Sequence, residues 1–185
     1  MSQYFCSIVD NALRNPAQRM YFDLGEYRYG LTVVGDGEPI VCFHGFSESS
    51  YTWDSINLTG YRLIRIDLIG HGDSDIPEED EAYTIPKMIE DLHTVIYHMV
   101  GDRYYLMGYS MGARIALSYA LQYDSEIEGL ILESGSVGIA SEAERAERRK
   151  ADEELAHHIE HNDGSWFASR WAEAPIFESQ KQLLP

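Results

Sequence analysis

The stretch Y-Y-L-M-G-Y-S-M-G-A-R-I-A-L-S-Y-A-L, residues 104–121, carries the strongest structural signal in this chain. A short apolar run is followed by G-x-S-x-G and then by apolar residues at helical spacing, an order that predicts a strand, a sharp turn and a helix. Gly108 and Gly112 leave space for a crowded turn, so the hydroxyl of Ser110 would project above the sheet. Ser110 is therefore the candidate nucleophile, and a structural turn serine is the alternative.

The flanking sequence predicts a mostly parallel α/β sheet. Strands are expected at 26–34, 40–43, 61–68 and 128–133, and a helix is expected between Pro86 and Gly101. The run I-V-C-F at 40–43 is apolar throughout, which is typical of a central strand covered on both faces. Strands that alternate with helices indicate right-handed crossovers between parallel strands.

Composition excludes several classes of protein. The chain has 185 residues, 44% of them hydrophobic, and a net charge of −17 from 14 basic and 31 acidic residues. Nucleic-acid binding needs clustered Lys and Arg, so a nucleic-acid partner is not expected. Neither a signal peptide nor an apolar run of membrane-spanning length is visible, so no membrane partner is expected and the cytoplasm is the expected compartment. The two cysteines make no disulfide framework, and Cys42 is expected to act as a small hydrophobe.

Three segments are expected along the chain: an N-terminal arm and first loop at 1–26, a sheet core at 27–135 and a partial helical cap at 136–185. The cap begins with a charged helix at 141–161, in which Ser141 and Glu144 have capping-box spacing. Trp166, Phe167, Trp171, Pro175, Ile176 and Phe177 follow as an aromatic cluster. Such a cluster packs a core or roofs a binding cleft, and the sequence does not choose between the two.

These motifs together resemble a known family. G-x-S-x-G, the H-G-F at 44–46 and the G-H-G-D-S at 70–74 are similar to those of α/β-hydrolases. Within that fold, G-Y-S-M-G-A-R-I-A-L, E-S-G-S-V-G-I, A-E-R-A-E-R-R-K-A-D and W-A-E-A-P-I-F resemble the 2-succinyl-6-hydroxy-2,4-cyclohexadiene-1-carboxylate synthases of menaquinone (vitamin K2) biosynthesis, the MenH-like lyases. The resemblance spans about residues 27–185.

The resemblance implies an elimination rather than a hydrolysis. A MenH-like enzyme removes a ring proton from 2-succinyl-5-enolpyruvyl-6-hydroxy-3-cyclohexene-1-carboxylate and expels pyruvate. Ser110 would be the base, and the amides of Phe46 and Met111 would stabilise the developing negative charge. The implied partner is a small polycarboxylate, and no cofactor is implied.

Four further residues are implied to bind this substrate: Tyr109, Arg114, Arg148 and Trp171. Arg114 stands one helical turn after Ser110, which puts it on the same helix face. A structural salt bridge is the alternative role for Arg114.

The acid and the histidine of a catalytic triad are not evident. In this fold they follow the serine after later strands, yet the 75 residues after Ser110 contain one recognisable strand before the cap. C-terminal strands of the sheet are therefore expected to be missing from this stretch of sequence. Glu133 ends that strand and is a weak candidate for the acid.

Histidines elsewhere in the chain offer no clear substitute. His44 and His71 are expected to hold their loops by hydrogen bonds. His157, His158 and His161 lie on the charged helix, where an i, i+4 pair could bind a metal, but no third ligand is evident and no metal is expected.

Three interpretations remain open: the menaquinone-pathway lyase, a generic esterase or carbon-carbon bond hydrolase of the same fold, and an inactive fragment. A pair of substrate-binding arginines favours the first over the second. Without the acid and the histidine, the 185-residue chain alone is expected to be nearly inactive. The sequence does not indicate the oligomeric state.

Overall fold

The computed structural model describes residues 17–56, 58–174 and 177–178. The chain divides into two compact units, one up to Val137 and one from Gly138 onward, and each is described by itself. Cys6 and most of the stretch expected to be a loose arm lie outside the described residues.

The first unit is built on a six-stranded sheet with the order β1-β2-β4-β3-β5-β6. Its strands are β1 (Gln18–Asp23), β2 (Arg28–Gly35), β3 (Glu38–Phe43), β4 (Tyr61–Ile66), β5 (Tyr104–Tyr109) and β6 (Ile127–Glu133). β4, β3, β5 and β6 run parallel, whereas β1 and β2 add an antiparallel edge. The predicted mostly parallel α/β sheet is confirmed.

β3 lies at the centre of the sheet, as its continuous apolar run predicts. Val41, Cys42 and Phe43 are fully buried, and burial raises the pKa of the Cys42 thiol to about 12. Cys42 is thus an inert core residue, as expected.

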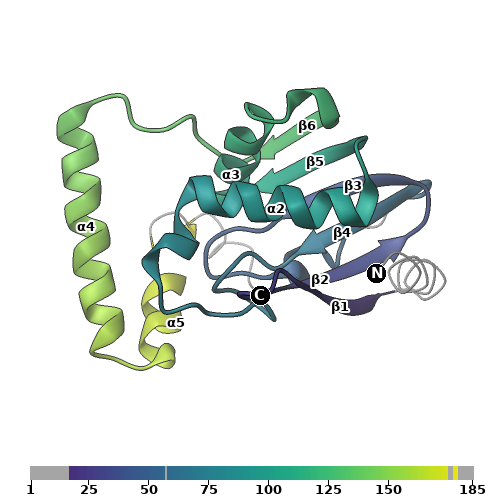
Figure 1. Cartoon of the computed structure of the whole chain (residues 1–185). Coiled ribbons are helices and arrows are strands. Elements are labelled where there is room, and N and C mark those ends of the chain that lie inside the picture. Colours follow the sequence, from purple (N-terminus) through teal and green to yellow (C-terminus); the bar gives the residue numbers. More distant parts are fainter. Residues whose placement is uncertain (1–16, 57, 175–176, 179–185) are drawn as a thin grey trace. The chain divides into compact units, whose positions relative to one another are not determined.

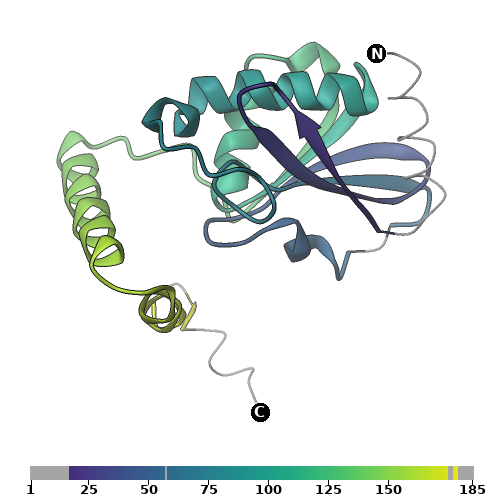
Figure 2. The same ribbon diagram turned by 60° about the horizontal axis from the view of Figure 1, so that its bottom comes forward.

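Two helices cover one face of the sheet and a short turn packs on the other. α2 (Ile85–Val100) and α3 (Met111–Ala120) join the main core on the first face (Figure 1). On the second face, the 3₁₀ turn η1 (Ser50–Trp53) places Trp53 in a smaller cluster; Figure 2 shows α2 and η1 on opposite sides of the sheet. Two further 3₁₀ turns are η2 (Asp80–Tyr83) and η3 (Asp124–Glu126).

The ends of α2 follow the signals in the sequence. Pro86 lies in the first turn, where its missing N–H costs nothing, and Gly101 closes the helix with a φ of 84° that favours glycine. β1, in contrast, lies in the stretch for which the sequence predicts an arm. Met20 and Phe22 pack on the core, whereas Arg19, Tyr21 and Asp23 are exposed, so the strand does alternate. It is a short edge strand that pairs with β2.

The second unit is helical in its described part. α4 (Glu142–Glu160) begins after Ser141, whose hydroxyl accepts the Glu144 N–H at 3.4 Å. Ser141 is therefore confirmed as the residue that caps the N-terminus of this helix. α5 (Gly164–Ala172), which the sequence does not predict as a helix, begins at Asp163, whose carboxylate accepts the Trp166 N–H at 2.9 Å. Neither helix contains a buried residue.

The aromatic cluster belongs to α5 and the residues after it. Phe167 stacks on Trp171 with ring centroids 5.7 Å apart, and Trp171 meets Phe177 edge-on at 6.0 Å. Pro175 and Ile176, also predicted to be part of this cluster, lie outside the described residues. None of the described aromatic residues of α5 is fully buried, so this cluster is not a closed core.

β6 forms an edge of the sheet within the described residues, where its only partner is β5. Leu130, Ile131 and Leu132 are between 37% and 47% exposed. No strand follows β6 in the described part of the chain, in agreement with the expectation from the sequence.

Candidate active site

Ser110 occupies a strained turn between β5 and α3. Its φ is 53° and its ψ is −109°, a conformation that a non-glycine residue adopts only where the surroundings impose it. The surroundings do so through a hydrogen bond in which the Ser110 N–H donates to the Glu133 carbonyl at the end of β6, at 2.9 Å. Ser110 is partly exposed. This is the geometry that G-x-S-x-G predicts.

The two glycines of the motif are required by close backbone contacts. A Cβ on Gly112 would collide with the carbonyl oxygens of Phe43 and His44. A Cβ on Gly108 would collide with the backbone of Gly112 and would lie 2.7 Å from Ala113 Cα. The turn after β5 is therefore pressed directly against the end of β3.

The H-G-F loop after β3 lies beside this turn. A Cβ on Gly45 would lie 3.1 Å from the ring of Tyr109, at the end of β5. The Gly45 N–H donates at 2.9 Å to the carboxylate of Glu48, which also accepts the Thr52 hydroxyl at 3.0 Å. Because the Gly45 amide is thus occupied, Phe46 supplies the next candidate donor in this loop.

The second candidate donor is the amide of Met111. Met111 is the first residue of α3, where N–H groups have no partner within the helix. The side chain of Ser110 makes no capping hydrogen bond. The positive end of the helix macrodipole adds to the attraction for negative charge at this position.

His44 fastens the loop after β3 to the loop after β4. Its Nδ1–H donates to the Gly45 carbonyl at 2.8 Å, and its Nε2 accepts the Leu68 N–H at 3.0 Å. Burial lowers the pKa of His44 to about 4, because the charged imidazolium would lose its hydration. With both nitrogens engaged, His44 holds its loops and is not available as the base, as expected.

His71 serves a similar local purpose. Its Nδ1–H donates to the Ile69 carbonyl at 3.1 Å, and its ring lies 5.2 Å from that of His44. The expectation that both loop histidines hold their loops is confirmed.

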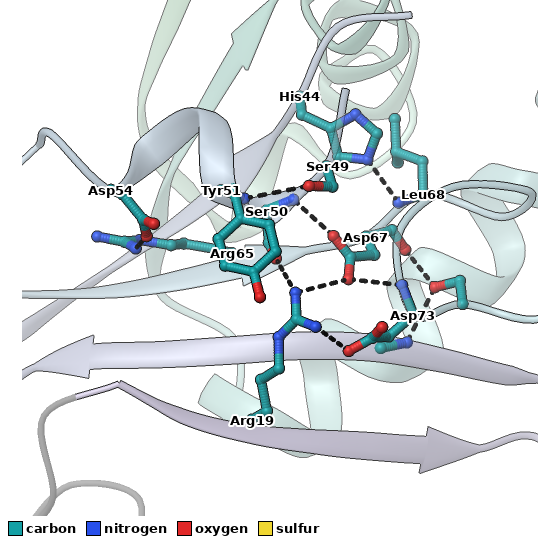
Figure 3. A network of polar contacts seen from close by, with 12 residues as sticks. Arg19, His44, Ser49, Ser50, Tyr51, Asp54, Arg65, Asp67, Leu68 and Asp73 are labelled. Carbon is teal, nitrogen blue, oxygen red and sulfur yellow. Dashed lines mark hydrogen bonds and ion pairs between the residues drawn. The ribbon is translucent and has the colours of Figure 1, made fainter. Parts of the chain in front are cut away.

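Asp67 anchors the same region from within. Its carboxylate is 1% exposed and accepts the Ser50 N–H at 2.5 Å and the Asp73 N–H at 3.0 Å. Figure 3 shows Arg19 of β1 reaching Asp67, with 3.8 Å between the closest charged atoms, and also pairing with Asp73. One buried carboxylate thereby joins β1, η1 and the loop after β4. The sequence signal for it is the aspartate that precedes G-H-G-D-S.

No triad partner for Ser110 is found in the described residues, which include all seven histidines. His93 interacts with Glu126 at 3.1 Å, and His98 Nδ1–H donates to the Thr94 carbonyl at 2.8 Å. None of the seven forms a hydrogen bond with Ser110. Glu133 contacts Ser110 through its backbone carbonyl, and its side chain is exposed.

Arg114 is exposed on α3, one turn after Ser110. Within the described residues, its guanidinium forms no ion pair. The alternative of a structural salt bridge therefore finds no partner for Arg114 among the described residues, and its role in substrate binding stays a prediction. Tyr109, which immediately precedes Ser110, is partly exposed beside the H-G-F loop.

Arg148 and Trp171 lie in the second unit and are described there only. Arg148 is exposed on α4, and its Nε donates to both carboxylate oxygens of Asp152 at 2.8 Å. Trp171 is partly exposed on α5, between Phe167 and Phe177. An exposed pair such as Arg148–Asp152 is worth at most about 1 kcal/mol, so another carboxylate can compete for this arginine.

The charged helix holds a third potential metal ligand that the sequence interpretation overlooks. Ligand atoms of His157, Glu160 and His161 all lie within 4.8 Å of one another. The expectation that no third ligand is available is wrong, since Glu160 stands three residues after His157 and shares its helix face.

Comparison with known proteins agrees with this geometry. The family model described as alpha/beta hydrolase fold matches residues 38–176, so the chain belongs to the α/β-hydrolase family. Within the described residues, no helix combines the length and the apolar character that crossing a membrane requires.

Among curated proteins, the chain is similar to 2-succinyl-6-hydroxy-2,4-cyclohexadiene-1-carboxylate synthases. It is 33% identical over 156 residues to the one from Salmonella typhimurium, covering 80% of this chain and 60% of that protein. A relative from Bacillus subtilis, to which that name is given provisionally, is 36% identical over 160 residues, covering 84% and 58%. The chain thus spans less than two thirds of the length of these relatives.

Solved structures of proteins named for other activities have the same fold. A thioesterase domain from the curacin biosynthetic pathway superposes with a TM-score of 0.64 and 27% identity, covering 69% of this chain and 48% of that one. An epoxide hydrolase from an endophytic Streptomyces gives a TM-score of 0.59 and 27% identity, covering 64% and 37%. Likeness in fold therefore does not select a reaction.

Proposed function

We propose that this protein is a MenH-like carbon-oxygen lyase of menaquinone biosynthesis. It would eliminate pyruvate from 2-succinyl-5-enolpyruvyl-6-hydroxy-3-cyclohexene-1-carboxylate to give 2-succinyl-6-hydroxy-2,4-cyclohexadiene-1-carboxylate. The observation that supports this most directly is the similarity to proteins named for that synthase activity, over 80% or more of this chain for the two relatives above. The strained serine turn gives the proposal its chemical centre.

In the proposed reaction, Ser110 acts as a base. A histidine takes the hydroxyl proton, and the serine oxygen takes a proton from the substrate ring. The electrons of that C–H bond form a double bond between C2 and C3, the existing ring double bond shifts to C4–C5, and the C–O bond to the enolpyruvyl group at C5 breaks. The electron pair of that bond leaves with the enolate of pyruvate, which takes up the proton held by the histidine. The amides of Phe46 and Met111 are proposed to stabilise the charge that builds on the conjugated carbonyl.

The histidine that takes the Ser110 proton is not among the histidines described above. His44 has both ring nitrogens engaged, and no other described histidine bonds Ser110. The chain covers 58% of the relative from Bacillus subtilis, and we propose that the histidine that activates Ser110 is supplied by the counterpart of the part that is not covered.

The proposed substrate carries several carboxylates, which calls for cations in a strongly acidic protein. Arg114 is suited to this role because it is exposed, close to Ser110 in the sequence, and without an ion pair among the described residues. Arg148 would exchange Asp152 for a substrate carboxylate. Tyr109 and Trp171 would supply apolar walls. Each charge-assisted bond is worth about 1.5 to 3 kcal/mol.

Pyruvate release by the native gene product, measured with the variant Ser110→Ala, tests the proposal. Loss of the base should lower kcat by at least about a thousandfold. Ser118→Ala is the matched control, because Ser118 lies two turns further along α3 and its hydroxyl only bonds the Arg114 carbonyl at 3.0 Å. Equal activity of the two variants would reduce the turn to a structural role and refute the proposal.

A hydrolase of the same fold is the second candidate, supported by the likeness to the thioesterase domain. An ester pocket for neutral substrates has no use for exposed arginines. Arg114→Ala or Arg148→Ala should therefore lower kcat/KM for the anionic substrate about ten- to a hundredfold, with partial rescue by lysine. Equal losses on a small neutral ester would mean that the arginines hold the scaffold, whereas no loss on the anionic substrate would remove them from the site and favour the hydrolase.

A further inference from the structure

The carboxyl end of α4 presents three side chains with metal-ligand chemistry on one face. His157, Glu160 and His161 stand at positions i, i+3 and i+4, which an α-helix brings to the same side. Their ligand atoms lie within 4.8 Å of one another, and the three residues are exposed. The reaction proposed above uses none of them.

A hydrogen bond prepares one of these imidazoles as a ligand. His161 Nδ1 lies 2.7 Å from the His157 carbonyl. A carbonyl oxygen only accepts, so Nδ1 carries the proton and Nε2 keeps its lone pair. Metal-binding histidines are commonly fixed in this way, with the second ring N–H donated to a backbone carbonyl. The rings of His157 and His161 are close as well, with centroids 4.2 Å apart.

We propose that His157, Glu160 and His161 form a binding site for a divalent transition-metal ion of the Zn²⁺ type. Two imidazoles and one carboxylate suit zinc, whereas Mg²⁺ and Ca²⁺ prefer oxygen ligands alone. Metal–ligand bonds of about 2.0 to 2.2 Å require a tighter cluster than is present, and rotation of three exposed side chains supplies it. A fourth position stays open to water.

The neighbouring histidine provides an internal control. His158 lies on the same helix, but its ring packs against Trp166 with centroids 5.5 Å apart. It therefore belongs to a different contact, and the site does not require it. None of the four residues is buried, so substitution of each leaves the fold intact, which circular dichroism can verify.

Calorimetric titration of the untagged protein with Zn²⁺ tests the site, and the visible spectrum with Co²⁺ reports its coordination. We expect one saturable site. His157→Gln and His161→Gln should each weaken Zn²⁺ affinity by at least about tenfold, Glu160→Gln should weaken it less, and His158→Gln should leave it unchanged.

Two outcomes would overturn the proposal. One is equal Zn²⁺ affinity in His157→Gln and His158→Gln, which would place the ion elsewhere. The other is a failure to discriminate Zn²⁺ from Mg²⁺, which would mean that the net charge of −17 attracts cations without a built site.

Discussion

Replacing Asp67 by asparagine removes a buried charge from the point where β1, η1 and the loop after β4 meet. One carboxylate oxygen accepts the Ser50 N–H and the other accepts the Asp73 N–H, at 2.5 and 3.0 Å. An asparagine keeps one acceptor and turns its NH₂ group toward the other amide. That amide loses its partner at a cost of about 1 to 3 kcal/mol, and the surviving bond loses its charge at a cost of about 1 kcal/mol.

The free energy of unfolding should therefore fall by about 2 to 4 kcal/mol. Urea denaturation followed by circular dichroism measures this change, with an unaltered m-value as the sign of an intact fold. Glu128→Gln is the matched control: Glu128 pairs with an exposed arginine, Arg103, at the surface, and its loss should cost no more than about 1 kcal/mol. If Asp67→Asn lowers the free energy of unfolding by no more than Glu128→Gln does, the claim that the buried carboxylate holds these segments together is refuted.

Three further predictions follow from other contacts. The folded pKa of His44, about 4, lies below its unfolded value, so stability is full above about pH 6.5 and falls by roughly 3 kcal/mol toward pH 4. His44→Gln should reduce the pH dependence of the unfolding free energy between these values by the amount that corresponds to uptake of about one proton. An unchanged pH dependence in urea denaturation would contradict this prediction. Gly112→Ala should cost more than about 3 kcal/mol or prevent folding, whereas Gly164→Ala, which meets nothing within 4 Å, should be tolerated in thermal melts. Arg114→Ala should leave the melting temperature unchanged while weakening substrate binding, and a large drop in melting temperature would show a structural role.

The sequence predicted those parts of the fold where local signals and tertiary demands coincide. The apolar run of β3 indicated a central strand, and Pro86 and Gly101 marked the ends of α2. The strands expected at 26–34 and 61–68 came within two residues of β2 and β4 at each end. The turn at Ser110 was predictable because Gly108 and Gly112 flank the serine between a strand pattern and a helix pattern, which is typical of a crowded strand-to-helix turn.

Prediction from the sequence failed where an element depends on pairing with a distant strand or where a contact joins residues that are far apart in the chain. β1 is short, and the alternation of Met20 and Phe22 with exposed residues is too brief to distinguish it from an arm before its pairing with β2 is known. α5 was hidden by an aromatic composition that is also typical of a core. Glu160 escapes a prediction based on histidine spacing alone, although residues at i+3 lie as close as residues at i+4 on a helix. The role of Asp67 could not be predicted from the sequence, because its partners lie in separate segments that only the fold brings together.

The position of β3 at the centre of the sheet also has a consequence for biosynthesis. β3 leaves the ribosome before both of its neighbours, β4 and β5. At ordinary translation rates, its apolar residues wait on the order of ten seconds for β5 to emerge. Until then, Val41 and Phe43 expose apolar surface that is prone to aggregate or to bind a chaperone. Slower translation between residues 44 and 104 should therefore lower the yield of folded protein, even though no amino acid changes.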